Sequence, residues 1–336
     1  MALFTSPQKN RMRVLVTGGS GFIGTNLVEH FVGRRDEVLN FDIAIPRNSS
    51  HLLNWHSGSL LDSVELRSLV REFAPEVIFH MAARTDLDGR SVDDYAANTV
   101  GVENLIAAVE GVTSLRRLIF ASSRLVCRIG YSPNDEFDYC PITPYGESKV
   151  IGEHLVRDAV SRLPCPALIV RPTSIWGPWF DVPYKTFFLT IARGRYVHPG
   201  SDRILKSFGF IGNTIHELVQ LMDAPVDAVA GKTFYLADYP PIDVAVMANT
   251  IQRALGVASI RTVSIGMLRP AAWVGDCLKM LGWRNPPLTS FRLDNLLTPM
   301  VHELDPLKAV VGTLPYSMED GVRITVDWLR AQGEVS

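Results

Sequence analysis

The sequence of 336 residues is poor in cysteine: four residues lie far apart and never form a Cys-x-x-Cys spacing. This scarcity argues against a structural zinc site and against a disulfide framework, and it fits a reducing compartment. We therefore expect no bound metal and a cytoplasmic location.

Long apolar runs and runs of one charge are also missing. The net charge is −2, and nothing in its distribution favours nucleic acid or an anionic membrane. The first residues lack the apolar segment of a signal peptide, and no uninterrupted apolar stretch reaches membrane-spanning length. The nearest one, residues 268–283, contains Asp276 and Lys279 and indicates an amphipathic helix. We expect neither a nucleic-acid partner nor a membrane partner.

What the first half contains is a regular alternation of short β-branched or aromatic runs with helical patterns. Strands that are apolar throughout are buried on both faces, and βα alternation requires a parallel sheet. The pattern predicts an α/β fold with a Rossmann-type doubly wound sheet. The expected strands cover residues 13–17, 37–43, 76–82, 116–123 and 167–172, and the expected helices cover residues 23–34, 62–73, 91–110 and 144–162.

After residue 175 the sequence is richer in aromatic residues, proline and glycine, and helical patterns then return. We expect a first domain over residues 1–175, rejoined by a strand near 232–238, and a smaller, mostly helical domain over residues 176–336. The helices expected in the second domain cover residues 213–223, 243–255, 303–311 and 317–331.

The segment "VTGGSGFIG" (16–24) follows the first strand and opens a helix. Glycines let the backbone turn tightly and approach a pyrophosphate, whose charge faces the helix N-terminus. Asp42 ends the second strand, where an acid accepts hydrogen bonds from ribose hydroxyls and repels a 2′-phosphate. Arg47 lies nearby, so NADP stays open as the less favoured cofactor. The pattern predicts that the first domain binds NAD, with contacts from Gly18, Gly21, Phe22, Ile23, Gly24 and Asp42.

A serine, a tyrosine and a lysine follow at the positions that proton transfer requires. The strand at 116–123 ends in Ser123, and the carboxyl ends of such strands line the ligand crevice. Tyr145 and Lys149 lie four residues apart, on one face of a helix. We expect the ammonium of Lys149 to lower the pKa of Tyr145, which then acts as acid and base, while Ser123 orients the substrate. Alone, the pair would favour a capped helix with a packed tyrosine, but the glycine loop upstream favours catalysis.

Together these motifs resemble the extended short-chain dehydrogenases/reductases, a group that includes nucleotide-sugar epimerases and dehydratases. The resemblance covers most of the chain in the family's order: "TGGSGFIG", "HMAA" (80–83), "NTVGVENLI" (98–106), "FASS" (120–123), "YGESK" (145–149) and "RPTSIWGP" (171–178). It implies further cofactor contacts and a homodimer formed by the helices at 91–110 and 144–162. The implied contacts are Ala82, Ala83, Asn98, Lys149 and Pro172.

Departures from the family pattern bear on the substrate. Ser123, Arg124 and Leu125 stand where dehydratases of the group place Thr-Asp-Glu, which argues against a 4,6-dehydratase. We expect an NAD-dependent nucleoside-diphosphate-sugar epimerase that works through a keto-sugar. Its substrate needs cations for the diphosphate and a flat surface for the base. The residues expected to contact the substrate are Ser122, Arg124, Ser174, Trp176, Arg203 and Lys206.

Two alternatives stay open at this point. One is a net dehydrogenase or reductase of a sterol-like or other alcohol, since the C-terminal sequence also resembles that branch. The other is a non-catalytic NAD-binding protein, against which Ser123, Tyr145 and Lys149 argue because binding does not need all three.

Overall fold

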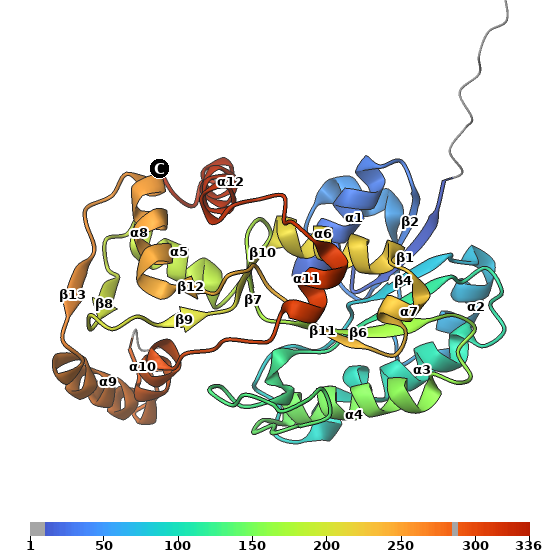
Figure 1. The fold of residues 1–336 in the computed structure, drawn as a ribbon, viewed down its shortest axis with the longest axis horizontal. Coiled ribbons are helices and arrows are strands. Elements are labelled where there is room, and N and C mark those ends of the chain that lie inside the picture. Colours follow the sequence, from blue (N-terminus) through green and yellow to red (C-terminus); the bar gives the residue numbers. More distant parts are fainter. Residues whose placement is uncertain (1–10, 284–287) are drawn as a thin grey trace, which may run out of the picture. The chain divides into compact units, whose positions relative to one another are not determined.

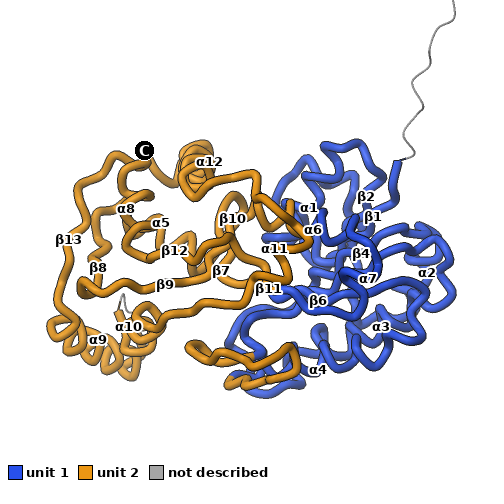
Figure 2. Tube along the Cα trace, viewed as in Figure 1, with its two compact units in different colours: residues 1–126, 143–171, 218–234 blue, residues 127–142, 172–217, 235–336 orange. Residues whose placement is uncertain are grey.

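The computed structural model describes residues 11–283 and 288–336. Most of the N-terminal segment, for which no signal peptide was expected, therefore lies outside the described residues. Contacts along the chain divide it into two compact units, coloured separately in Figure 2. Unit 1 comprises residues 1–126, 143–171 and 218–234. Unit 2 comprises residues 127–142, 172–217 and 235–336.

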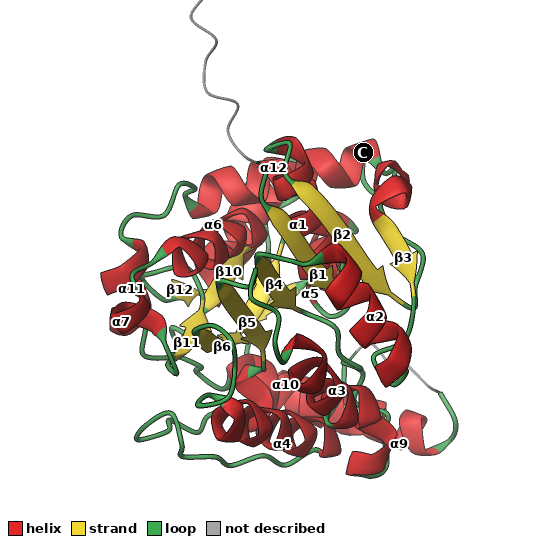
Figure 3. Ribbon diagram, turned by 90° about the vertical axis from the view of Figure 1, so that its right-hand side faces the viewer, coloured by secondary structure: helices red, strands yellow, loops and turns green. Residues whose placement is uncertain are grey.

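Unit 1 is built on a seven-stranded sheet of order β11-β6-β5-β4-β1-β2-β3 (Figure 3). The pairs among β1 to β6 are parallel, which confirms the predicted doubly wound sheet, and β11 is the expected late strand. β3 was not predicted, because a strand of three residues leaves no periodic pattern. The strands are β1 (Arg13–Thr17), β2 (Glu37–Asp42), β3 (Trp55–Ser57), β4 (Val77–His80), β5 (Arg117–Ala121), β6 (Ala167–Pro172) and β11 (Thr233–Leu236).

Helices cover both faces of this sheet. One core layer joins apolar side chains of α2 (Ser63–Phe73), α3 (Val100–Val109) and α4 (Pro144–Ala159) to alternate residues of the strands, such as Ile78. The next residue, Phe79, points to the opposite face. There its ring lies 5.4 Å from that of Phe31 in α1 (Phe22–Gly33). Strand alternation thus builds two apolar layers around the sheet.

The prediction of one helix over residues 91–110 is wrong. The segment forms a 3₁₀ helix, η2 (Val92–Asn98), followed by α3, and Thr99 between them has φ −119° and ψ −79°. The side chain of Asn98 accepts a hydrogen bond from the Arg84 amide (2.9 Å) and donates one to the Arg84 carbonyl (3.0 Å). These two bonds tie Asn98 to the loop after β4, at the point where the helix is interrupted.

Unit 2 is mostly helical, as expected, with three small two-stranded sheets (Figure 1). β7 (Ser174–Trp176) pairs with β10 (Phe208–Phe210), β8 (Val197–Pro199) with β13 (Arg261–Val263), and β9 (Leu205–Lys206) with β12 (Ile242–Asp243). The unit contains α5 (Tyr184–Ala192), α8 (Val244–Leu255), α9 (Ile265–Met280), α10 (Ser290–Leu297), α11 (Asp305–Val311) and α12 (Met318–Ala331).

Two further helices, α6 (Ile211–Asp223) and α7 (Val226–Val229), lead the chain from unit 2 back into unit 1. Among the residues that the structure describes, no helix has the length and apolar character needed to cross a membrane.

Candidate active site

The glycine loop between β1 and α1 is packed so closely that side chains would not fit at two positions. Gly18 has φ +74°, and a Cβ there would lie 2.4 Å from the amide nitrogen of Ala82, at the end of β4. A Cβ on Gly24 would lie 2.0 Å from the Gly18 carbonyl oxygen. The loop closes through a 3.0 Å hydrogen bond from the Gly21 amide to the Gly18 carbonyl. This bare backbone, at the N-terminus of α1, is the cradle that a pyrophosphate requires. Phe22 and Ile23 form the first turn of that helix.

Asp42 lies at the carboxyl end of β2, beside this loop. Its carboxylate accepts hydrogen bonds from the amides of Ser20 and Ala44, both at 2.9 Å. Arg47, because of which NADP was kept as an alternative cofactor, donates from Nε to the Ser20 carbonyl at 3.2 Å. The carboxylate therefore has a fixed position and oxygen lone pairs to offer a ribose. The glycine cradle and this acid together fit a dinucleotide such as NAD.

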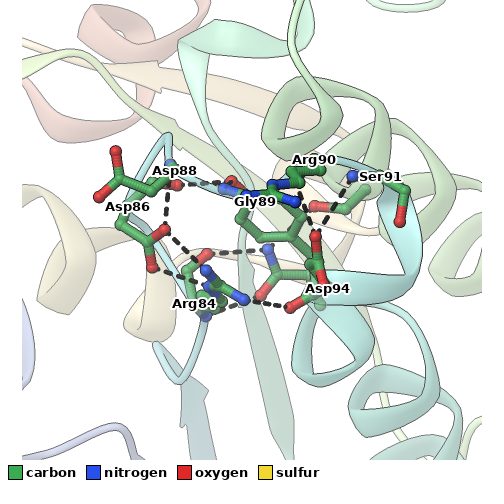
Figure 4. Close-up of polar contacts among 10 residues, drawn as sticks. Arg84, Asp86, Asp88, Gly89, Arg90, Ser91 and Asp94 are labelled. Carbon is green, nitrogen blue, oxygen red and sulfur yellow. Dashed lines mark hydrogen bonds and ion pairs between the residues drawn. The ribbon is translucent and has the colours of Figure 1, made fainter.

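The loop that follows β4 is held by a dense set of polar contacts (Figure 4). Arg84 forms a two-point ion pair with Asp86 (2.8 and 3.0 Å) and donates to the Asp94 carbonyl. The Asp94 carboxylate accepts from the amides of Arg90 (2.7 Å) and Ser91. These hydrogen bonds lower the pKa of both Asp86 and Asp94. Ala82 and Ala83 precede this loop and are half-buried.

This loop also reaches Tyr145, a connection that the sequence did not reveal. Tyr95 is fully buried, its hydroxyl donates to the Asp86 carbonyl, and its ring lies 5.9 Å from that of Tyr145. Asn98 donates to the Ser148 hydroxyl at 2.9 Å, and Ser148 donates to the Tyr145 carbonyl at 2.7 Å. Asn98 therefore supports the first turn of α4 as well as the loop.

Tyr145 stands in that first turn, where Thr143 caps the helix by accepting from the Gly146 amide and Pro144 occupies the first helical position. The phenol of Tyr145 lies beside Ser123, just beyond β5, close enough for the serine hydroxyl to affect the pKa of the tyrosine. Burial raises the pKa of Tyr145, whereas the Ser123 hydroxyl and the charge of Arg124 lower it. The pKa of Tyr145 is therefore raised overall in the structure, whereas a lowered pKa was expected, and the cation that opposes the rise is Arg124 and not the expected Lys149.

Lys149 lies one turn further along α4 and donates from Nζ to the Ala121 carbonyl at 2.7 Å. Burial lowers the pKa of Lys149 to about 8, and the charge of Glu153 opposes that decrease. The pKa of His80 falls to about 3, first through burial and then through the charge of Lys149. His80 is therefore neutral at pH 7, and its Nδ1 lies 2.7 Å from the Thr17 hydroxyl.

A buried ion pair behind Lys149 was also not predicted from the sequence. Glu153, one turn after Lys149, forms two 2.8 Å hydrogen bonds with Arg171 of β6, and both side chains are almost fully buried. Glu153 shares a face of α4 with Lys149 because the two lie four residues apart, but nothing local in the sequence identifies Arg171 as its partner. A small cavity under the site is lined by His80, Asn98, Ser122, Lys149 and Glu153, among others.

Two of the predicted substrate residues lie in unit 1, next to Ser123. Ser122 is buried, its amide donates to the Val170 carbonyl at 2.7 Å, and its Oγ has no hydrogen-bond partner among the described residues. Arg124 begins the short 3₁₀ helix η3 (Arg124–Val126) and is half-buried. Both residues therefore border the Ser123–Tyr145 pair.

The remaining predicted residues belong to unit 2, together with Pro172 at the end of β6. Ser174 in β7 is buried, and its Oγ has no partner among the described residues. Trp176 is fully buried and packs on Phe188 and Phe210, so both faces of its indole belong to the core of unit 2.

The two predicted cations of unit 2 already have partners. Arg203 lies on the surface and pairs with Asp243 at 3.3 Å. Lys206 is buried and donates from Nζ to the Asn295 carbonyl at 2.6 Å. The structure thus gathers the proposed catalytic residues in unit 1, whereas the predicted diphosphate cations of unit 2 are engaged within their own unit.

Comparisons with known proteins agree with this geometry. The sequence model of the NAD dependent epimerase/dehydratase family matches residues 14–234. The 2-alkyl-3-oxoalkanoate reductase of Stenotrophomonas maltophilia is 28% identical over 330 residues, which cover 93% of this chain and 98% of the relative. The N-acetyl-alpha-D-glucosaminyl-diphospho-ditrans,octacis-undecaprenol 4-epimerase of Escherichia coli O157:H7 is 23% identical over 94% of both chains.

Among solved structures, the UDP-glucuronic acid 4-epimerase of Bacillus cereus in complex with NAD superposes with a TM-score of 0.74, at 18% identity, over 95% of this chain and 96% of that one. At 18% identity, this similarity shows only that the two proteins share a fold. The family match covers well over half of the chain and contains both the glycine loop and the Ser123–Tyr145–Lys149 set. This chain belongs to the NAD-dependent epimerase/dehydratase family and is an NAD-dependent enzyme of the extended short-chain dehydrogenase/reductase type.

Proposed function

We propose that this enzyme interconverts a secondary alcohol and a ketone, with Tyr145 as the acid and base. The observation that carries this proposal is the placement of the Tyr145 phenol beside Ser123, with Lys149 one turn away on the same helix. In that arrangement Tyr145 accepts the hydroxyl proton and later returns it, Ser123 holds the oxygen, and Lys149 supplies positive charge. The chemistry that NAD supplies when bound is reversible hydride acceptance at the substrate carbon.

We assign NAD binding to residues 1–175 with the returning strand β11, and substrate binding mainly to residues 176–336. Gly18, Gly21 and Gly24 would receive the pyrophosphate, and Asp42 the adenosine ribose. The remaining cofactor contacts in the proposal are Phe22, Ile23, Ala82, Ala83, Asn98, Lys149 and Pro172.

For the net reaction, the first candidate is epimerisation of a nucleoside-diphosphate sugar through a keto-sugar. Relatives that are named as sugar epimerases, such as the one from E. coli, support it. A dehydratase is disfavoured because Arg124 and Leu125 occupy η3, where such enzymes place two carboxylates. In this reading, Arg124 and Ser122 contact the sugar beside Tyr145.

The second candidate is a net dehydrogenase or reductase acting on a sterol-like or alkyl substrate. Two observations favour it. Trp176 lies in the core and Lys206 is bonded to a carbonyl, so neither offers a nucleotide a ready contact. The relatives include the 2-alkyl-3-oxoalkanoate reductase and a yeast sterol-4-alpha-carboxylate 3-dehydrogenase, the latter 26% identical over 94% of this chain and 97% of the relative.

We also propose that the enzyme is a homodimer paired through α3 and α4. Both helices carry partly exposed aliphatic side chains, namely Val100, Ile151 and Val160. A monomer at micromolar concentration in sedimentation velocity would contradict this proposal.

The decisive experiment combines a substrate panel with the variant Tyr145→Phe. The unmodified enzyme is incubated with NAD and either nucleotide-sugars or steroid alcohols, and the products and NADH are both measured. New sugar epimers without net NADH identify the epimerase, and stoichiometric NADH identifies the dehydrogenase. Tyr145→Phe should lower turnover by about 10³-fold and leave NAD affinity within a few-fold.

The matched control is Tyr316→Phe, which removes a phenol hydroxyl from an exposed tyrosine of unit 2. It should leave turnover unchanged. Full activity of the Tyr145→Phe variant would overturn the catalytic assignment and would favour an NAD-binding protein whose chemistry lies elsewhere.

A further inference from the structure

Helix α9 presents its apolar side to solvent instead of to the protein. Only Ala272 and Gly275 among its 16 residues are buried. Gly275 lies so close to the chain of the following segment that a Cβ there would be 1.8 Å from the Leu288 carbonyl oxygen. The contact is extended by Asp276, which accepts a hydrogen bond from the Ser290 amide at the start of α10. The fully buried positions of α9 are thus small residues, Ile265, Leu268 and Leu278 are half-buried, and several other large residues are exposed.

The outer face consists of two adjacent rows of exposed side chains. Met267, Ala271 and Val274 follow each other at spacings of four and three residues, so they lie along one side of the helix. Trp273 and Met280, seven residues apart, form the neighbouring row. Exposure is high along both rows, at 71% for Met267, 65% for Trp273 and 87% for Met280. Leu281 and Trp283 directly after the helix, and Phe291 in α10, are exposed as well.

We call these residues the α9 face: Met267, Trp273, Val274, Met280, Leu281 and Trp283. An amphipathic helix of a globular protein normally turns such residues toward the core. A contiguous exposed apolar surface marks a site of interaction with a protein or a membrane. Figure 1 shows α9 beside α10 at the margin of unit 2.

Charge around the α9 face favours an anionic partner. In the described residues of 261–297 there are four basic side chains, Arg261, Arg269, Lys279 and Arg292, and two acidic ones, Asp276 and Asp294. The whole chain has a net charge of −2, whereas the basic side chains outnumber the acidic ones in this segment. Arg269 leaves α9 between its inner and outer faces and lies 3.6 Å from Asp294, and from such a border position a long side chain can reach past an apolar contact toward charged head groups.

We propose that the α9 face docks on the surface of a bilayer that contains anionic phospholipids. Tryptophan, methionine and leucine on one side of a helix with cations at its border are the composition of helices that lie in the membrane interface. A helix of 16 residues spans about 24 Å, less than the roughly 30 Å of a hydrocarbon core, so it lies in the plane of the interface.

A second copy of the chain fits this face less well. A symmetric dimer places identical patches together, which would bring the basic residues of both copies to one interface. Anionic head groups complement the same charges. The expectation of no membrane partner relied on the absence of a spanning segment and of a run of basic residues, and an in-plane helix needs neither.

The test is flotation of the full-length enzyme with vesicles of phosphatidylcholine alone or with about 30% phosphatidylglycerol. We expect binding to the anionic vesicles to exceed binding to neutral ones by roughly tenfold and to weaken at high salt. Val274→Glu, or Trp273→Glu, should reduce the bound fraction by about tenfold, because each places a carboxylate in the buried contact.

The matched control is Val64→Glu, which makes the same substitution on α2 at a valine that is 79% exposed. This variant should bind vesicles like the unmodified enzyme. Circular dichroism and NAD titration check that each variant is folded. Absence of binding to anionic vesicles, or equal binding of Val274→Glu, would overturn the proposal. A dimer that dissociates on Val274→Glu, with no binding to lipid, would overturn it in favour of a second copy.

Discussion

Buried charge is handled in opposite ways in the two units. In unit 1, Glu153 and Arg171 are nearly inaccessible to water and form a two-point ion pair at 2.8 Å. In unit 2, Glu217 is equally buried, yet neither carboxyl oxygen has a hydrogen-bond partner among the described residues. Burial, and then the charge of Asp238, raises the pKa of Glu217 well above its usual range.

The difference shows what each unit does with acidic groups. An ionised carboxylate persists in a protein interior only beside a cation or several donors. Glu153 meets that condition and keeps a charge that acts on Lys149, one of the proposed catalytic residues. Glu217 does not meet it, and its pKa is raised by burial and by the charge of Asp238, which favours the neutral acid. The first arrangement maintains an electrostatic field at the site, and the second places a neutral polar group in a core.

The largest effect should come from breaking the charged pair. Glu153→Gln preserves shape but leaves Arg171 without its counter-charge, and this should lower the free energy of unfolding by about 3–5 kcal/mol. Urea denaturation at pH 7 measures the change. Glu147→Gln, at an exposed position of the same helix, should change stability by less than about 0.5 kcal/mol. Similar losses in both variants would mean that the ion pair contributes nothing specific.

A smaller effect of opposite sign is expected in unit 2. The folded-state pKa of Glu217 lies above its unfolded value, so the stability linked to its proton is full in acid and is lost as pH rises through the folded pKa. Glutamine has no proton to lose, so the Glu217→Gln variant does not lose this stability as the pH rises. The variant should match the unmodified enzyme near pH 4 and exceed its stability by about 1–3 kcal/mol near pH 8.

Asp238 should add to the same trend in the unmodified enzyme. Burial raises the pKa of Asp238 from 3.8 to about 7, so stability linked to its proton is lost between those values as pH rises. Thermal denaturation across pH 4–8 measures both groups, with the exposed Glu319→Gln as control. A pH-independent difference between Glu217→Gln and the unmodified enzyme would show that Glu217 is ionised in the folded state.

The smallest effect joins the ion pair to catalysis. With a pKa of about 8, Lys149 loses its charge in mild alkali, and kcat/KM should fall there. Because Glu153 raises that pKa, Glu153→Gln should move the alkaline limb to lower pH by roughly half to one unit. The pH–rate profile of Glu147→Gln should stay in place. An unmoved limb in Glu153→Gln would separate the ion pair from the catalytic lysine.

Local patterns were sufficient to predict the sheet, the glycine loop and Asp42, because each depends on residues close in sequence. Ser123, Tyr145 and Lys149 were placed by strand ends and by helix spacing, and Ser123 and Tyr145 do meet. The interruption of the helix at Thr99 was not predicted, because the hydrogen bonds between Asn98 and Arg84 that accompany it join two different elements. The role of Arg171 was not predicted, for the same reason.

The helix at α9 was predicted, but the side of it that faces the protein could not be, for another physical reason. Residues 268–283 read as an amphipathic helix, and such a pattern fixes which residues share a face. It does not say which face the protein covers. Gly275 decides that, since only its lack of a side chain lets α9 approach the chain at Leu288 with the small residues inward.

The loop of residues 84–94 bears on the kinetics of binding. Its hydrogen bonds with Asp86, Asp94, Tyr95 and Asn98 are made within the protein itself and hold the segment in one conformation (Figure 4). A flexible loop loses conformational entropy when it closes on a ligand, and this loss costs about 1–2 kcal/mol of free energy for each residue fixed. A loop ordered beforehand avoids that loss, and encounter with the cofactor is then limited by diffusion and orientation instead of by folding of the loop.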